Sequence, residues 1–149
     1  MKSLFSSEAY SEIKQRIEKV DPNKPPEWGK MNPAQMMHHC QKPLEVVLSK
    51  RIVKKPNPFM RLLMKTFKGM MYNDKPWKQN LPTAKEFIVT DTKEFEKEKT
   101  QLISLLEEFN QKNENKALPP HPIFGSFTNE QWGKMQYKHL DHHLRQFGA

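Results

Sequence analysis

Apolar residues recur every three or four positions in five stretches of the chain, with charged residues between them. This spacing predicts amphipathic helices, because side chains three and four residues apart lie on one face of a helix. Four of the predicted helices span residues 7–20, 33–52, 54–72 and 129–147. The remaining one precedes the polar segment 110–115, and no stretch alternates in a way that predicts a sheet. We therefore expect an all-α protein.

Polar residues followed by proline mark where the second and third helices begin. Asn32 is a favoured N-cap and Pro33 a favoured first helical residue, and Asn57 with Pro58 repeats the pattern. Pro43 lies inside the second helix, where it lacks the N–H that the helix needs, at a cost of about 3 kcal/mol. We expect that helix to continue with a bend.

The third helix is amphipathic and basic. Its polar side carries Arg61, Lys65 and Lys68, and its apolar side carries Phe59, Leu62, Leu63, Phe67, Met70 and Met71. Some basic amphipathic helices lie on a membrane surface. The commoner role is a cover or crossover packed on the same core, and this is the interpretation that we favour.

Capping signals also precede the last two helices. Asp91 or Thr92 can cap the fourth, and Thr128 with Gln131 has the spacing of a capping box for the fifth. The apolar stripe of the fourth helix consists of Phe95, Leu102, Leu105, Leu106 and Phe109. Four main helices and one accessory helix predict an antiparallel bundle.

Length and composition fit one domain over residues 1–149. Only 36% of residues are hydrophobic, but nine Phe, three Trp, three Tyr and nine Met supply bulky side chains for a core. We find no signal peptide and no run long enough to span a membrane, and Cys40 is the only cysteine. A cytoplasmic protein is expected, with Cys40 as a small buried hydrophobic residue.

The net charge of +8 raises the question of nucleic-acid binding. Lysines are scattered among glutamates in stretches such as KEFEKEKTQ, as on a solvated helix face. We therefore expect no nucleic-acid partner.

Five of the six histidines lie on two predicted helices, and helical periodicity sorts them by face. His38 shares its face with polar residues and should meet water, whereas His39 lies among apolar residues and should face the core. On the last helix, His142 lies with Lys138, Asp141 and Arg145 and should meet water. His139 and His143 lie on the opposite, inward side.

The inward histidines can form a metal site. His139 and His143 are four residues apart, so their Cβ atoms lie about 5–6 Å apart on one face. With His39 from the second helix they supply three nitrogen ligands and leave a coordination position open. The alternative is that all three are core histidines hydrogen-bonded to the backbone or to one another. Imidazole ligands alone do not choose among zinc, nickel, iron and copper.

Two segments, WGKMNPAQMMHHC and HPIFGSFTNEQWGKMQYKHLDHHLRQFG, together with LPTAKEF, resemble a domain-of-unknown-function branch of the DinB-like superfamily. The resemblance spans nearly the whole chain. It implies a four-helix bundle whose divalent metal, zinc or nickel, is held by His39, His139 and His143, with Gln146 beside the last histidine. Relatives in the superfamily include thiol-dependent S-transferases and a maleylpyruvate isomerase.

Three functions remain open at this point. The first is a metal-dependent enzyme acting on a small molecule, which the resemblance favours as transfer of a low-molecular-weight thiol. The second is a metal- or ligand-binding module without turnover, such as a stress-response protein. The third is a structural bundle, and a homodimer is compatible with all three. No acidic residue on the two histidine helices faces inward to serve as a general base, since Glu45 shares the face of His38.

Aromatic residues can wall a pocket over such an ion. The candidates are Trp28, Trp77, Phe124 and Trp132. For any one of them, an ordinary place in the core or a loop is the simpler interpretation. His121, in the proline-rich loop, could reach the mouth of the pocket, but we expect it at the surface.

Overall fold

The computed structural model describes residues 1–112 and 117–149, and within these ranges it has five α-helices, two short 3-10 helices and no strand. The helices are α1 (Ser7–Glu18), α2 (Pro33–Val47), α3 (Pro58–Thr66), α4 (Phe95–Asn110) and α5 (Asn129–Gln146). The 3-10 helices are η1 (Lys68–Met71) and η2 (Lys85–Phe87). The all-α prediction is confirmed. The polar segment 110–115 follows the end of α4 as expected, although its residues 113–115 lie outside the described ranges.

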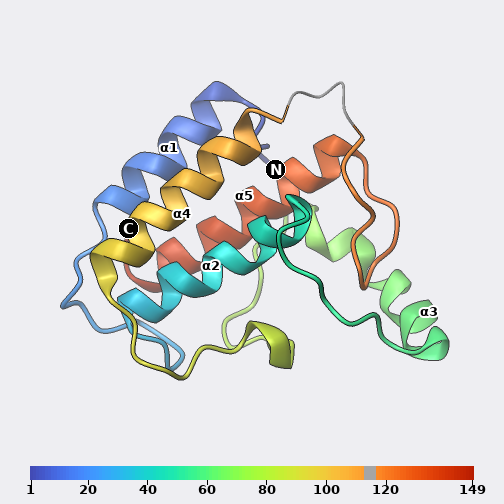
Figure 1. The fold of residues 1–149 in the computed structure, drawn as a ribbon, viewed down its shortest axis with the longest axis horizontal. Coiled ribbons are helices and arrows are strands. Elements are labelled where there is room, and N and C mark those ends of the chain that lie inside the picture. The colour runs from blue at the N-terminus through green and yellow to red at the C-terminus, as the bar shows by residue number, and fades with distance from the viewer. Residues whose placement is uncertain (113–116) are drawn as a thin grey trace.

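Four of the five α-helices surround one apolar core (Figure 1). Helix α1 contacts α4 and α5, and α2 contacts the same two helices. The predicted stripe of α4 is buried from Leu102 to Phe109, and only Phe95 at its start is partly exposed. The core therefore holds α2 and α5 side by side, which are the two helices that carry five of the six histidines.

Helix α2 ends five residues earlier than predicted. It includes Pro43 as expected, but Ser49 adopts a positive φ of 60° just beyond its end. The N–H of Ser49 donates to the oxygen of Val46 at 3.1 Å, and the N–H of Lys50 donates to that of Glu45 at 2.8 Å. These bonds satisfy carbonyls of the last turn, as in a Schellman motif. Glycine usually occupies this position, so a serine gave no stop signal in the sequence.

Helix α4 begins at Phe95, with Glu94 as its N-cap, rather than after Asp91 or Thr92. Glu94 makes no side-chain capping bond. The predicted caps of the other helices are confirmed: Asn32, Asn57 and Thr128 each accept a hydrogen bond from the backbone three residues later.

Helix α3 does not cover the core, so the favoured interpretation of this segment was wrong. The predicted helix over 54–72 is divided into α3 and η1, and no residue of α3 is buried. Figure 1 shows α3 at the edge of the molecule, away from the four bundle helices. Its partly exposed Met64 is its one residue packed against the core. Among the described residues, no helix combines the length and apolar character needed to cross a bilayer.

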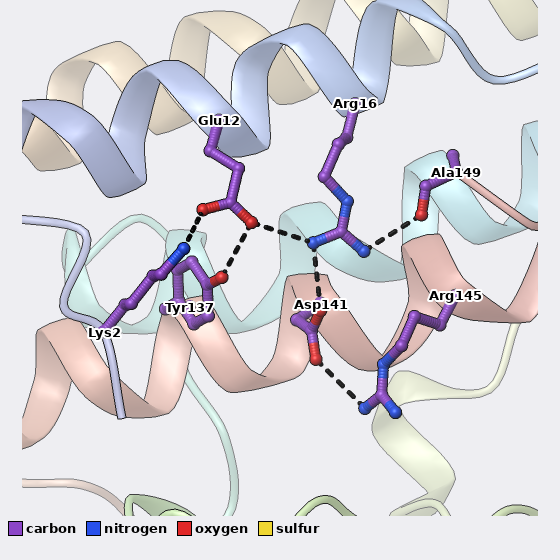
Figure 2. Close-up of polar contacts among 7 residues, drawn as sticks. All are labelled: Lys2, Glu12, Arg16, Tyr137, Asp141, Arg145 and Ala149. Atoms are coloured by element: carbon purple, nitrogen blue, oxygen red, sulfur yellow. Dashed lines mark hydrogen bonds and ion pairs between the residues drawn. The ribbon is translucent and has the colours of Figure 1, made fainter.

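Polar contacts fix α1 against the outer side of α5 (Figure 2). Arg16 donates to Asp141 at 2.9 Å and to the backbone oxygen of Ala149 at 3.0 Å. The hydroxyl of Tyr137 donates to Glu12 at 2.9 Å. The same network contains Lys2 and Arg145. Because one side of α5 is held to α1, the turn that carries His139 and His143 faces α2.

Candidate metal centre

Three histidines from two helices meet between α2 and α5. One ring nitrogen each of His39, His139 and His143 lies within 4.8 Å of those of the other two. The Nε2 atoms of His39 and His139 are 3.2 Å apart, and the ring of His143 lies 4.6 Å from that of His39 between centroids. These are the three residues that helical periodicity selected. Among the described residues, they form the group of side chains suited to holding a metal ion.

His39 is oriented by a backbone carbonyl. Its Nδ1 lies 2.8 Å from the carbonyl oxygen of Phe87, at the end of η2. A carbonyl only accepts, so Nδ1 carries the proton and donates. The Nε2 atom is then unprotonated, and its lone pair points at His139. Neutral histidines that ligate metals through one nitrogen are commonly held in this way through the other.

His143 is oriented through Gln146, and the direction of each bond can be deduced. The amide Nε2 of Gln146 donates to the carbonyl oxygen of Trp28, which can only accept. The amide oxygen of Gln146 must then be the atom that faces Nδ1 of His143, at 2.9 Å. Nδ1 of His143 is therefore the donor, and its Nε2 is left with a free lone pair.

Gly29 makes this arrangement possible. It has a φ of +82°, and a Cβ atom at this position would lie 2.6 Å from Nε2 of Gln146. Both the backbone conformation and the close approach favour glycine. The loop after α1 thus reaches α5 closely enough for Trp28 to hold Gln146.

His139 is the least satisfied of the three. Its Nδ1 is buried and has no hydrogen-bond partner among the described residues. If Nε2 of His139 carries the proton and donates to His39, then Nδ1 of His139 is a buried acceptor without a donor. If Nδ1 carries it, two lone pairs face each other across 3.2 Å. A cation between the Nε2 atoms of His39 and His139 would remove the repulsion between their lone pairs. The distance also fits, because two nitrogens about 2.0–2.1 Å from a tetrahedral ion lie about 3.3 Å apart. The donor set fits a divalent metal.

Burial keeps all three imidazoles neutral at neutral pH. Removal from water lowers the pKa of His39 to about 4 and that of His143 to about 3. The pKa of His139 is also lowered, first by burial and then by its histidine neighbours. The neutral form is the one that ligates a metal.

A cavity of about 420 Å³ opens beside the cluster. His39 and His143 reach its wall, whereas His139 lies behind them. The remaining lining residues come from the loop after α1, the start of α2, the segment before α4 and the end of α5: they include Trp28, Met31, Gln35, Asn80, Phe87, Ile88 and Gln146. Among the residues that the structure describes, no aspartate or glutamate lines it. A small molecule in this cavity would reach two of the three histidines.

The prediction that His142 meets water was wrong. It is 7% exposed, and its ring packs against Trp28 and Trp77, with centroids 5.7 Å and 5.8 Å away. Lys138, which helical periodicity also put on the solvent face, is 1% exposed and donates to the backbone oxygens of Met70 and Asn73. The long connection between η1 and α4 covers this side of α5, which periodicity within one helix does not reveal.

His38 meets the predicted environment only in part. Its side chain is 22% exposed, and its Nδ1 lies 2.8 Å from Glu98 of α4. Gln41 donates to the same carboxylate at 2.7 Å. This pair lies between α2 and α4 and ties the two helices together.

His121 is buried rather than at the surface, so that prediction was also wrong. Its Nδ1 accepts from the backbone N–H groups of Ile123 and Phe124, at 3.1 Å and 3.2 Å. Its ring packs against Phe124, Phe127 and Trp132. Phe124 and Trp132 therefore form a separate aromatic cluster, and of the four proposed pocket aromatics only Trp28 lines the cavity.

Cys40 is 1% exposed, and burial raises the pKa of its thiol. Its sulfur lies 3.7 Å from that of Met36. Cys40 is a core residue, as predicted, and its thiol is kept protonated and away from solvent.

Comparison with known proteins places the chain in one family. No curated protein and no solved structure matches it. Residues 6–149 match the family DUF1569, which is described as a protein of unknown function. Because the match covers nearly the whole chain, this protein belongs to the DUF1569 family.

Proposed function

We propose that this protein holds one divalent ion, zinc or nickel, through His39, His139 and His143, and presents it to a small molecule in the adjoining cavity. The observation that carries the proposal is the direction of the lone pairs. Nδ1 of His39 and Nδ1 of His143 are both committed as donors, so the acceptor of each ring is its Nε2, and one ring nitrogen of each of the three histidines lies within 4.8 Å of the others. Without an ion, the one hydrogen bond that the three rings can share, from Nε2 of His139 to Nε2 of His39, leaves the buried Nδ1 of His139 an acceptor without a donor.

Such an ion, when bound, supplies Lewis acidity that lowers the pKa of a water or thiol ligand. The chain's own contribution is position and surroundings. The carbonyl of Phe87 and the amide of Gln146 fix two imidazole rings, while Trp28 and Met31 form an apolar wall. His142 also lines the cavity and makes no hydrogen bond within the described ranges, so its ring can bond a substrate there.

We further propose that the reaction is transfer of a low-molecular-weight thiol. The resemblance to DinB-like S-transferases supports this class. The cavity also favours it over hydrolysis, because hydrolases with catalytic metals commonly use a carboxylate as general base, and no carboxylate of the described residues lines this cavity. A thiol has a lower pKa than water and needs less help to become a nucleophile.

The same lack of a carboxylate supports a second candidate, a module that binds a metal or ligand without turnover. The two candidates share the site and differ in whether a ligand of the ion is consumed.

Replacement of zinc by Co²⁺ tests the proposal through a spectroscopic signal. We expect visible ligand-field bands on loading, and a new thiolate-to-cobalt band when a small thiol such as 2-mercaptoethanol is added. Cys40 is buried with a raised pKa, so this band would report the added thiol. A spectrum identical to that of aqueous cobalt would refute metal binding. Cobalt binding without a thiol band would refute thiol transfer and favour the binding module.

A further inference from the structure

Helix α3 exposes an apolar surface that the rest of the chain leaves uncovered. Phe59 is 78% exposed, Leu62 66% and Leu63 46%. The same surface continues through Met60, Phe67 and Met70, which are 42–44% exposed. Phe59, Leu62 and Leu63 are three and four residues apart, so they share one side of the helix. Adjacent exposed apolar side chains of this size mark an interaction surface.

The surroundings of this surface are strongly basic. No acidic residue occurs between Glu45 and Asp74. From residue 54 onward this segment carries Lys54, Lys55, Arg61, Lys65 and Lys68. None of these five pairs with a carboxylate among the described residues.

The contrast with the preceding residues is informative. Lys50 pairs with Glu108, and Arg51 pairs with Glu45 at 2.6 Å. These two cations are neutralised by carboxylates of the bundle, whereas the five around α3 have no carboxylate partner among the described residues. One of the five, Lys68, donates to the backbone oxygen of Ser126, and the other four are left for a partner. Glu86 is the one carboxylate that shares a groove with Lys54 and Lys55, and it makes no ion pair with either.

We propose that α3 docks this protein on an anionic lipid surface, lying in the plane of the interface. Its apolar side would enter the boundary between headgroups and acyl chains, with the lysines among the headgroup phosphates. At nine residues, or about 14 Å, the helix is too short to span a bilayer. The proposal is independent of the metal site.

Two other occupants fit less well. A symmetric contact between two copies through α3 would bring the five unpaired cations of each copy together, which is unfavourable. Duplex nucleic acid would meet the cations but would leave Phe59, Leu62 and Leu63 without an apolar partner. A bilayer satisfies both features at once.

The 3-10 helix η1, which follows α3, is hydrogen-bonded to the bundle. Lys138 of α5 donates to the carbonyl oxygen of Met70 in η1 at 2.8 Å, and Nε1 of Trp77 donates to the same oxygen at 2.9 Å. Trp77 in turn packs on His139, with ring centroids 5.9 Å apart. Docking through α3 would therefore hold the whole bundle in a defined orientation on the surface.

Cosedimentation with vesicles tests the apolar half of the proposal. The vesicles contain phosphatidylserine as a minority lipid in phosphatidylcholine, with pure phosphatidylcholine as the comparison. We expect binding to the anionic vesicles that weakens as salt is added. The double variant Phe59→Ser, Leu63→Ser should partition about a hundredfold less well. Both side chains are exposed, so its thermal unfolding should match that of the parent.

A pair of charge-matched variants tests the basic half. Lys55→Gln with Lys65→Gln removes two cations near α3, whereas Lys19→Gln with Lys97→Gln removes two exposed cations, one at the C-cap of α1 and one on α4. We expect the first to lower the partition coefficient about thirtyfold and the second to change it little, since a cation near such a surface is worth about 1 kcal/mol.

Three outcomes would overturn the proposal. One is equal loss of binding in the two charge-matched variants, which would indicate only net charge. Another is binding that needs the lysines but not Phe59 and Leu63, which would indicate a purely electrostatic partner such as nucleic acid. The third is absence of vesicle binding together with concentration-dependent dimers in sedimentation that the Phe59→Ser, Leu63→Ser variant abolishes, which would assign the surface to a second copy.

Discussion

Two buried histidine environments in this protein have the same pKa behaviour and different architecture. Burial lowers the pKa of both His39 and His121 to about 4. The acceptor nitrogen of His121 receives two backbone N–H groups. The acceptor nitrogen of His39 instead faces another imidazole nitrogen 3.2 Å away. Burial and a lowered pKa are thus common to both histidines. What separates a structural histidine from a candidate metal ligand is the group that its unprotonated ring nitrogen faces.

Substitution of one histidine from each environment should distinguish a metal ligand from a structural histidine most clearly. We expect His143→Ala to weaken zinc binding more than about a hundredfold, since a ligand contributes roughly 3 kcal/mol of the total. His121→Ala should leave zinc affinity unchanged and lower the free energy of unfolding by about 3 kcal/mol, because two buried N–H groups lose their acceptor. Titration calorimetry and urea unfolding measure the two effects. If both variants lost zinc affinity equally, the distinction would fail.

Gln146 tests whether the orientation of His143 matters. Gln146→Leu removes the acceptor of the His143 Nδ1 proton and should weaken zinc binding about 10–100-fold. Gln136→Leu is the matched control, since Gln136 is also buried on α5, about one turn from the cluster, but donates to the carbonyl oxygen of Pro43 rather than bonding a histidine. It should affect stability alone. Equal affinities in the parent and Gln146→Leu would show that Gln146 has no role in the site.

Gly29 tests the same contacts less directly, because it lies against Gln146, which in turn bonds His143. A methyl group there would displace the Gln146 amide, so Gly29→Ala should weaken zinc binding by about tenfold or less. A Cβ at Gly69 would meet nothing within 4 Å, which makes Gly69→Ala the control. The account predicts a smaller effect than for Gln146→Leu, and an effect from Gly69→Ala of the same size would count against it.

The last expected effect is a pH dependence shared by both environments. In the unfolded chain a histidine gains its proton near pH 6.5, whereas folded His39 and His121 do so near 4. The unfolded state therefore binds more protons between these values, and stability of the metal-free protein falls as the pH drops below about 6.5. Urea unfolding between about pH 7 and pH 5 measures the slope. The slope of the unfolding free energy against pH gives the number of protons taken up on unfolding. This number should fall by up to one in either His39→Gln or His121→Gln. A flat profile in the parent would contradict the folded-state pKa values.

The sequence predicted most of the fold because the bundle is built from long amphipathic helices with clear caps. It also selected His39, His139 and His143, since the side of each helix that faces the core follows its period. The positions of His142 and Lys138 were missed for the same reason. They lie on the other side of α5, which the connection carrying Trp77 covers. Whether a loop covers one side of a helix depends on tertiary contacts, which the periodicity of that helix does not reveal.

Other misses follow from local exceptions. Ser49 ends α2 in a conformation that usually calls for glycine. His121 was placed at the surface because it lies in a proline-rich loop, yet that loop folds over its own aromatic cluster. The contact between Gly29 and Gln146 joins residues more than a hundred positions apart, so spacing gave no signal for it.

We propose above that the lone pairs of His39, His139 and His143 converge on one metal ion. The most direct test of this claim is elemental analysis of protein purified without a metal-affinity step, compared with the His139→Ala, His143→Ala double variant. We expect close to one divalent ion per chain in the parent and almost none in the variant. Absence of metal from both proteins, even after incubation with zinc, would contradict the claim and leave the cluster as a part of the core.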